Sequence, residues 1–263
     1  MAMNRIIVIT SGKGGVGKTT CTANLGMALA KSGKRVVVID ADFGLRNLDL
    51  LLGLENRIVY TALDVLAGEC RLDQALVKDK RQPNLALLPA AQNRSKESIT
   101  PDQMKKLVRA LTKAYNFVLI DSPAGIEMGF RNAIAAAREA IIVTTPEISA
   151  VRDADRVIGL LEANDVKAMR LIINRLKPAM VEAQQMMSVK DVQDILAVPL
   201  LGVIPDDEQV VVSTNNGEPL ILDKELSQAG TAVSNIARRL QGDKVPLMDL
   251  SVPTDSFFTK LRR

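Results

Sequence analysis

The amino-acid sequence predicts an α/β fold, with a mostly parallel, twisted β-sheet flanked by helices in three layers. Short runs rich in Val, Ile and Leu alternate with longer segments of helical periodicity. The short runs are almost continuously apolar, as expected for strands that are covered on both faces. Such alternation produces parallel strands joined by right-handed crossovers.

Seven short apolar runs are predicted as strands. In chain order they are Arg5–Thr10, Arg35–Asp40, Leu85–Pro89, Phe117–Asp121, Ala140–Thr145, Arg170–Asn174 and Leu200–Ile204. The first predicted helix, Thr19–Lys31, places Leu25, Ala28 and Leu29 on one stripe. It stops before Gly33, a residue type that often ends helices.

Three further helices are predicted between and after the strands. Thr100 is expected to cap the first of them, which has Pro101 at its first position and runs to about Lys113. The next covers Ser149–Asn164. The last is marked by the helical spacing of Leu226, Ala229, Val233, Ile236 and Leu240.

The composition indicates one globular domain and excludes several kinds of chemistry. Of the 263 residues, 47% are hydrophobic and 24% charged, so a packed core is expected over residues 1–241. Because the chain has no histidine, Ser-His-Asp hydrolysis, His-ligated zinc and histidine base catalysis are excluded. Two cysteines, Cys21 and Cys70, cannot hold a four-cysteine cluster within one chain, and they suit a reducing compartment.

Charge and hydropathy bear on partners and location. The net charge is +4, and three positive charges lie at Lys260, Arg262 and Arg263, so the rest of the chain carries only +1. No specific nucleic-acid partner is therefore expected. The sequence shows no signal-peptide core and no apolar stretch near the ~20 residues of a membrane span. We expect a cytoplasmic protein, or one in the interior of an organelle.

A phosphate-binding loop is the strongest motif. Residues 12–19 match the pattern G-x-x-x-x-G-K-[ST] between a predicted strand and a predicted helix. Backbone N–H groups and the helix dipole would bind phosphate, which makes the fold one of P-loop NTPase type. Lys18 would reach the β- and γ-phosphates, and the Thr19 hydroxyl would bind Mg²⁺. The predicted nucleotide-binding residues here are Gly12, Lys13, Gly14, Gly15, Val16, Gly17, Lys18, Thr19 and Thr20. The alternative is a chance glycine-rich turn.

Acidic residues follow two of the predicted strands. Asp40 and Asp42 come at the end of one strand, and Asp121 ends another, with Gly125 shortly after it. A carboxylate at a strand end beside a phosphate loop is typical of the Walker B position near Mg²⁺. Without histidine, Asp42 is the candidate that orients the attacking water, and the Gly125 N–H could meet a γ-phosphate. Each Asp could instead be a helix cap or a turn residue.

Lys13 is a second lysine in the loop. It is either a solvated surface residue or a lysine that crosses a dimer interface to the partner's nucleotide.

These motifs together resemble the deviant Walker A ATPases of the ParA/MinD family. The loop with its early Lys13 is shared by the whole family. Five further segments are similar to the MinD group within it, namely 42–50 (switch I in that group), 121–127, 145–153, 202–207 and the turn 216–219. Residues 176–190 depart from the pattern of the group.

The resemblance implies a Mg²⁺-dependent ATPase that uses ATP and releases ADP. It would be monomeric without ATP and would form a sandwich homodimer with it. Lys13 would cross to the partner, and Glu147 would hold Lys13 in one state. Asp40 and Asp42 would serve the Mg²⁺ waters and the hydrolytic water, with Asp121 behind them. The residues that would bind the metal are Thr19, Asp42 and Asp121. The catalytic residues would be Lys13, Lys18, Asp40, Asp42 and Asp121. The nucleotide base would be bound by Asn174, Pro205 and Asp207.

The resemblance also implies partners in division-site placement. These are a MinC-like division inhibitor and a MinE-like topological regulator. The partner-facing residues would be Arg46, Asn47, Glu147, Asp153 and Asp155. Two other classes remain open at this point: a ParA-type partition ATPase that acts on DNA, and an iron protein whose cysteines bridge a cluster across a dimer.

The end of the chain has the pattern of an interfacial membrane helix. After a predicted tether, 242–253, the segment 254–263 places Phe257, Phe258 and Leu261 on one side. Lys260, Arg262 and Arg263 lie away from that side or near its edge, which suits anionic lipid. The protein would then be peripheral on the inner membrane face when ATP is bound. The alternative is that the two phenylalanines pack back on the domain.

Overall fold

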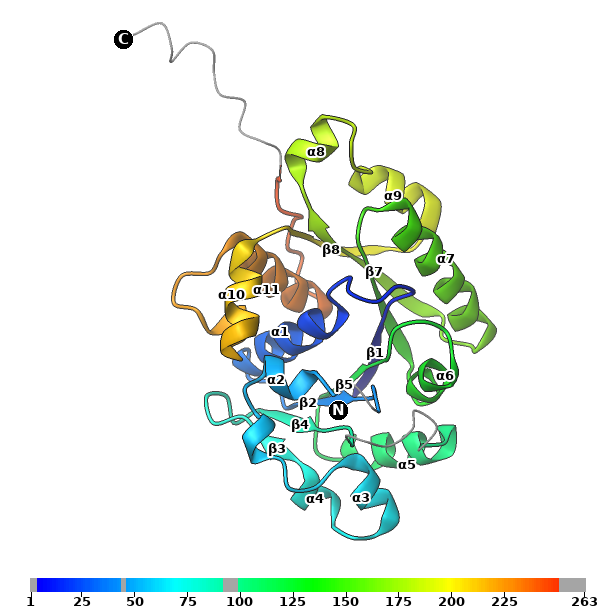
Figure 1. Ribbon diagram of the computed structural model, residues 1–263, viewed down its shortest axis with the longest axis vertical. Coiled ribbons are helices and arrows are strands. Elements are labelled where there is room, and N and C mark those ends of the chain that lie inside the picture. Colours follow the sequence, from blue (N-terminus) through cyan, green and yellow to red (C-terminus); the bar gives the residue numbers. More distant parts are fainter. Residues whose placement is uncertain (1–3, 44–45, 92–98, 251–263) are drawn as a thin grey trace, which may run out of the picture.

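The protein forms a three-layer α/β fold (Figure 1). The structure is a computed structural model and describes residues 4–43, 46–91 and 99–250. The described residues form one eight-stranded sheet in the order β3-β4-β2-β5-β1-β6-β7-β8. The strands are β1 (Arg5–Thr10), β2 (Val36–Asp40), β3 (Val77–Lys78), β4 (Leu85–Leu88), β5 (Phe117–Asp121), β6 (Glu139–Thr144), β7 (Ala168–Leu176) and β8 (Leu200–Pro205).

All seven predicted strands are present, with ends that differ by no more than two residues. The sheet is parallel except for the edge strand β3, which pairs antiparallel with β4 and was not predicted. Two residues are too few to show a strand pattern in a sequence.

Helices cover both faces of the sheet. They are α1 (Lys18–Lys31), α2 (Leu48–Leu51), α3 (Ala62–Ala67), α4 (Leu72–Ala75), α5 (Pro101–Leu111), α6 (Met128–Ile134), α7 (Ile148–Ala163), α8 (Pro178–Glu182), α9 (Val189–Leu196), α10 (Glu208–Asn216) and α11 (Gln228–Leu240), with 3₁₀ turns η1 (Glu55–Arg57) and η2 (Leu220–Leu222). In β1, Ile6 and Val8 join one core cluster with α5, α6, α7 and α9, whereas Ile7 and Ile9 join the other with α1 and α11. Each face of the sheet is therefore buried, as the apolar strands require.

The four predicted helices are confirmed, and their ends follow ordinary capping rules. Thr100 accepts a hydrogen bond from the Gln103 N–H and Gln103 bonds back, which forms a capping box before Pro101. Gly33 follows α1 with φ 83°. The predicted start of the last helix is wrong by two residues, because Ser227 caps α11 and leaves Leu226 outside it.

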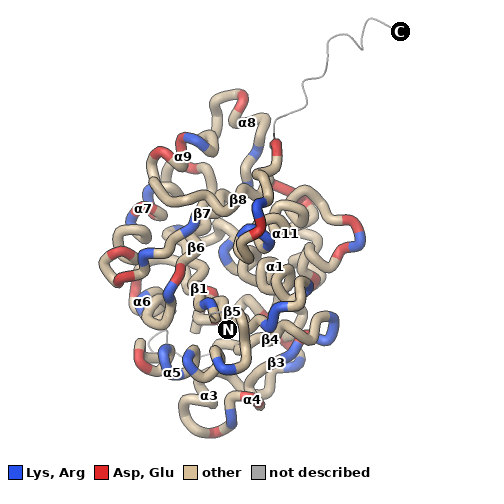
Figure 2. Tube along the Cα trace, turned by 180° about the vertical axis from the view of Figure 1, so that it is seen from behind, with Lys and Arg blue, Asp and Glu red and all other residues tan. Residues whose placement is uncertain are grey.

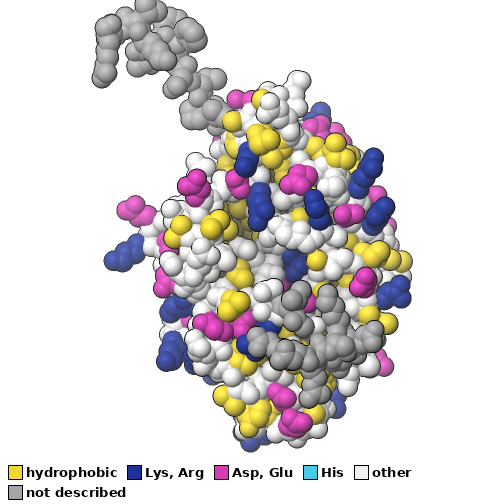
Figure 3. Space-filling model, viewed as in Figure 1, with side chains coloured by type: hydrophobic (Ala, Val, Ile, Leu, Met, Phe, Trp, Pro, Cys, Tyr) yellow, Lys and Arg dark blue, Asp and Glu magenta, His cyan; other side chains and the backbone are white. Residues whose placement is uncertain are grey.

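Residues 176–190, which departed from the family pattern, form the end of β7, α8 and the beginning of α9. Ser188 caps α9 in a capping box with Asp191. Figure 3 shows hydrophobic side chains gathered on the surface at this end of the molecule.

The chain after α11 lies irregularly against β8. The Arg239 guanidinium donates to the carbonyl groups of Leu201, Val245 and Pro246, which fixes the segment up to that point. The predicted membrane residues Phe257, Phe258, Lys260, Leu261, Arg262 and Arg263 lie outside the described residues. Within the described ranges, none of the helices has the length and apolar character needed to cross a bilayer.

Candidate active site

The phosphate loop lies between β1 and α1, as the motif predicts. Gly15 and Gly17 have φ of 79° and 92°, which favour glycine, and Gly17 is the N-cap residue of α1, where it provides no side-chain cap. The first N–H groups of α1 are thus left for a ligand. At Gly12 a β-carbon would lie 2.2 Å from the Asp153 carbonyl oxygen. Gly12, Gly15 and Gly17 are therefore required for the shape of the loop, and this cradle shape and its N–H donors fit phosphate.

Lys18 meets the acidic end of β5 inside this cradle. Its Nζ is 3.0 Å from Asp121 Oδ1, and both side chains are almost fully buried. Thr22 Oγ1 also donates to Asp121, at 2.9 Å, and Lys18 Nζ lies 3.4 Å from Thr19 Oγ1. The structure thus brings Lys18, Thr19 and Asp121 together. A buried, hydrogen-bonded lysine of this kind can bind phosphate charge with little water competing.

Asp40 binds backbone N–H groups, a role that the sequence did not predict. It is 1% exposed and accepts backbone N–H bonds from Asp42 at 3.0 Å and from Asn47 and Leu48 at 3.2 Å each. One carboxylate therefore holds both ends of the segment that carries Asp42. Asp42 is partly buried at the carboxyl end of β2, where it was predicted. Asp40 is thus committed to backbone groups, and Asp42 remains the candidate for orienting water.

Lys13 forms a weak contact at the surface. Its Nζ is 3.3 Å from Glu147 Oε2 and 3.0 Å from Ser149 Oγ, and the two charged side chains are about half exposed. Exposed ion pairs contribute roughly 0–1 kcal/mol, so Lys13 can leave this partner at low cost. The predicted contact between Lys13 and Glu147 is present, and its role across a dimer remains a prediction.

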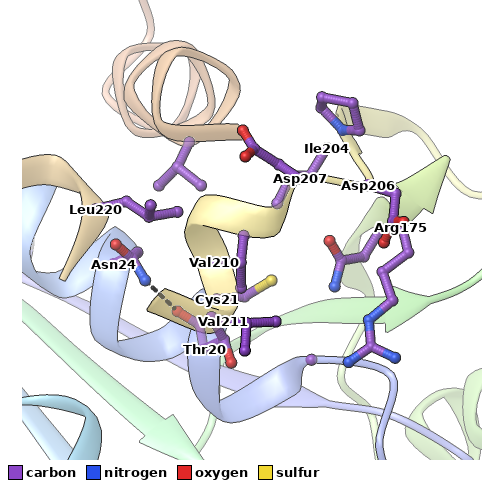
Figure 4. Close-up of a pocket in the computed structure, with 14 residues that line it drawn as sticks. Thr20, Cys21, Asn24, Arg175, Ile204, Asp206, Asp207, Val210, Val211 and Leu220 are labelled. Atoms are coloured by element: carbon purple, nitrogen blue, oxygen red, sulfur yellow. Dashed lines mark hydrogen bonds between the residues drawn. The ribbon is translucent and has the colours of Figure 1, made fainter. Parts of the chain in front are cut away.

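A pocket of about 290 Å³ opens beside the phosphate loop (Figure 4). The predicted base-binding residues Asn174, Pro205 and Asp207 line it, as does Thr20. Asn174 Nδ2 donates to the Val16 carbonyl at 2.8 Å, so the phosphate loop orients this amide. Asp206, within the predicted base-lining loop 205–207, also lines the pocket. The other lining residues were not predicted, because the motifs mark only part of each segment: Cys21, Asn24, Arg175, Ile204, Val210, Val211, Leu220 and Val233.

Asp207 lines the pocket but its carboxylate serves the fold. One oxygen caps α10 by accepting the Gln209 N–H at 2.9 Å, and the other accepts the Ala229 N–H at 3.0 Å. Asp207 therefore joins α10 to α11 and shapes the pocket wall.

The sequence matches the CobQ/CobB/MinD/ParA nucleotide binding domain family over residues 7–220. It is 65% identical to the septum site-determining protein MinD of a Synechocystis species, over 99% of this chain and 98% of that protein. The chain belongs to the MinD family. Among solved structures, the Aquifex aeolicus MinC:MinD cell division protein complex matches with a TM-score of 0.87 and 52% identity, over 93% of this chain and 98% of that one. A Pyrococcus horikoshii MinD complexed with Mg-ADP matches with a TM-score of 0.83 and 34% identity, over 92% and 100%.

Membership of the MinD family confirms the predicted P-loop fold and the ATPase class. The predicted ATP/ADP and Mg²⁺ cofactors agree with the Mg-ADP complex of the Pyrococcus relative. Solved structures at 19–23% identity, among them a ParA family ATPase from Chlorobium tepidum and a putative plasmid partition protein from Borrelia burgdorferi, share the fold alone.

The cysteines of this MinD-family chain do not suit an iron cluster. Burial and the nearby Asp121 carboxylate raise the pKa of the Cys21 thiol to about 12, so it is not a thiolate at neutral pH. Cys70 lies in the connection between α3 and α4, outside the pocket lining. The iron-protein alternative is therefore disfavoured.

The predicted partner-facing residues of this MinD-family chain differ in exposure. Asn47, Glu147 and Asp155 are exposed, and Asp153 is partly exposed and pairs with Arg156 at 3.5 Å. Arg46 is the exception, since its side chain is 12% exposed and pairs with Asp49 at 2.7 Å. The structure thus gives Arg46 a place inside the switch I segment (residues 42–50) rather than on its surface.

We expect Asp40 to make stability depend on pH near neutrality. Burial, and then the neighbouring Asp121 carboxylate, raise the pKa of Asp40 from its ordinary 3.8 to about 7. A raised pKa means that the folded state binds the proton more tightly than the unfolded state, so this group favours folding below pH 4 and loses that effect as the pH rises through 7. Asp40→Asn does not titrate. The free energy of unfolding of the parent protein should therefore rise relative to Asp40→Asn as the pH falls from 8 to 5.5, measured by urea unfolding. A difference that stays constant over this range would contradict the assignment.

Proposed function

We propose that this chain is a Mg²⁺-dependent ATPase that dimerises on ATP binding and attaches to membrane through residues 254–263. In this proposal it places the division site by recruiting a MinC-like division inhibitor and by responding to a MinE-like regulator. The observation that carries the proposal is the cluster of Lys18, Thr19 and Asp121 inside a glycine cradle. When bound, Mg²⁺ would neutralise phosphate charge, and in this proposal Thr19, Asp42 and Asp121 would hold it or its waters.

The proposed roles within the site follow from position. Lys18 binds the β- and γ-phosphates and Asp42 orients the hydrolytic water. Gly125, with φ 86°, follows β5 at the same edge of the sheet, and its N–H, which donates to the Ser11 carbonyl at 3.4 Å, would have to leave that acceptor to meet a γ-phosphate. Lys13 leaves Glu147 and crosses to the nucleotide of the partner. The weak, exposed Lys13–Glu147 pair supports this step, because little stability is lost when it opens.

The proposed partners rest on the relatives and on the exposed residues near α7. The Aquifex aeolicus relative was solved in a complex of MinC and MinD. In this chain Glu147 and Asp155 are exposed on α7 or just before it, and Asn47 is exposed beside α2. These residues offer acidic and amide groups to a protein partner.

The proposed membrane attachment is weak for one chain and stronger for two. Two Phe and one Leu contribute about 5–8 kcal/mol if fully buried, and each basic residue adds roughly 1 kcal/mol near anionic lipid. The conformational entropy lost when so short a helix becomes ordered offsets much of this favourable binding free energy. A dimer presents two segments, and avidity can exceed the single-site affinity by ~10²–10⁴. ATP would thus control membrane residence by controlling dimerisation.

Sedimentation with anionic liposomes tests the proposal. We expect the full chain to sediment with ATP more than with ADP, and Phe257→Asp or removal of residues 254–263 to abolish this difference. The matched control Phe257→Leu keeps an apolar side chain and should retain binding. Light scattering should show that ATP-dependent dimerisation survives in every variant.

Equal liposome binding by the truncated chain would overturn the membrane assignment. Salt-sensitive retention on DNA by the ATP-bound protein would favour the ParA-type alternative instead. In Figure 2 basic and acidic residues are interspersed over the face seen from behind, which argues against a broad DNA-binding surface there.

A further inference from the structure

Two glycines bring α2 and α10 into backbone contact. Gly53 follows α2 with φ 59°, and Gly217 ends α10 with φ 63°. A β-carbon on Gly53 would lie 2.7 Å from the Gly217 carbonyl oxygen, and one on Gly217 would lie 3.0 Å from Gly53 Cα. Figure 1 shows α2 and α10 side by side at this place. We call this contact the α2–α10 junction.

Arg81 bridges the junction. Its guanidinium donates to the Gly217 carbonyl at 3.2 Å and to the Leu52 carbonyl, one on each side of the contact. The buried Asp79 carboxylate holds the guanidinium in place, with Arg81 Nη2 2.7 Å from Asp79 Oδ2. A planar guanidinium with several fixed donors can do this, whereas a lysine ammonium cannot reproduce the arrangement.

The two helices continue from the junction to different parts of the active site. At its other end α10 begins beside Asp207, and Val210 and Val211 in its first turn line the base pocket. A nine-residue helix spans about 14 Å, so α10 connects the base pocket to the junction directly. At its other end α2 begins at Leu48, whose N–H bonds to Asp40.

We propose that the α2–α10 junction is a positioning device that couples occupation of the base pocket to the placement of Asp42. Base and ribose in the pocket would fix the position of the first turn of α10. Through the α2–α10 junction, the position of α10 then fixes that of α2. Asp40, which bonds to the N–H groups at both ends of residues 42–48, couples the position of α2 to that of Asp42. Gly53, Gly217 and Arg81 are positioning residues, because they act through other groups. The inference rests on the proposed role of Asp42 in hydrolysis.

Other glycines show why this contact differs from an ordinary turn. Gly68 has φ 79° after α3, and a β-carbon there would meet nothing within 4 Å. Gly68→Ala therefore has the backbone strain of Gly53→Ala without the clash at the junction. Arg71 provides a second control, since it pairs with Asp73 at 3.0 Å on the open surface. The two residues of the Arg71–Asp73 pair are separated by two positions in the sequence, as are those of the Asp79–Arg81 pair.

The first experiment compares four variants in ATP hydrolysis. We expect kcat to fall about fivefold or more in Gly53→Ala and in Arg81→Lys, a coupling of ordinary size, while ATP affinity and KM change little. Gly68→Ala and Arg71→Lys should keep the parent kcat. If Gly53→Ala does not fold, Arg81→Lys alone decides. The inference is overturned if kcat is unchanged in the junction variants, or if the control variants lose as much.

The second experiment does not depend on hydrolysis. Hydrogen exchange at the Asn47 and Leu48 amides is measured with Mg-ADP and with Mg-pyrophosphate, two probes that differ by the nucleoside. In the parent protein and in Gly68→Ala, Mg-ADP should slow exchange more than pyrophosphate does, and in Arg81→Lys this difference should vanish. Equal slowing by the two probes in the parent protein would overturn the inference. A parent protein that fails to hydrolyse ATP would overturn the proposed function, while the exchange result would still decide the junction.

Discussion

Lys18→Ala should remove nucleotide binding and destabilise the protein at the same time. Lys18 supplies the positive charge of the cradle, and losing one partner of a desolvated charge pair costs about 2–5 kcal/mol, or about thirtyfold or more in the Kd for ATP. The substitution also leaves Asp121 buried without its cation, 3.0 Å from where Lys18 Nζ was. That should lower the free energy of unfolding by about 3–5 kcal/mol. Calorimetric titration and urea unfolding measure the two effects.

A double variant separates binding from folding. Lys18→Ala with Asp121→Asn removes both members of the pair, and Thr22 can still bond the new amide. Much of the lost stability should return, because no charge is left buried and unpaired. ATP binding should not return. ATP affinity and turnover that are unchanged in the single variant would contradict the assignment of the phosphate loop.

Mixing two inactive variants should restore activity. Asp42→Ala should still bind ATP and dimerise, yet lose hydrolysis by about 10²–10⁴-fold, because orienting the water is a transition-state role. Lys13→Ala should be inactive because its partner's site lacks the lysine. A mixed dimer has one site with an intact Asp42 and a lysine from the other chain. At equal amounts about one quarter of the parent activity should return, since half of the dimers are mixed and each has one complete site.

Two controls accompany the mixing experiment: the stability of Lys13→Ala and the direct detection of mixed dimers. Lys13 has no buried contact, so Lys13→Ala should melt like the parent protein. Mixed dimers are detected by differently tagged chains. No recovery of activity in demonstrated mixed dimers would show that Lys13 acts within its own chain. If Asp42→Ala fails to bind ATP, Asp42 serves the metal or the fold, and another group orients the water.

The sheet and the phosphate loop could be predicted because their signals are local. Apolar runs of five or six residues mark β1 and β5, and the glycine spacing of residues 12–19 defines the loop without reference to other segments. Short helices such as α2 and α4, with four residues each, carry no periodicity that a sequence pattern can show. They form because tertiary contacts stabilise them.

The unpredicted parts of the site depend on contacts between distant segments. Asp40 was predicted to serve the Mg²⁺ waters because of its place at a strand end, and the sequence could not show that the N–H groups of Asn47 and Leu48 turn back to it. Arg81 bonds Gly217, which is 136 residues away in the chain. Exposure of Arg46 could not be predicted for the same reason, since its pairing with Asp49 depends on how the segment folds.

The close approach of Gly12 to Asp153 places the outer helix α7 in direct contact with the phosphate loop. The neighbour of Gly12 is the carbonyl group of Asp153, and a β-carbon would overlap it at 2.2 Å. Because this contact is made by backbone, replacing side chains of α7 leaves it in place, whereas moving the helix as a body presses on the loop. A protein that binds α7 at the exposed Asp155 would thus contact the helix that packs against the phosphate loop, without entering the site. The rate of ATP hydrolysis would then change when a partner on the surface displaces α7 against the phosphate loop.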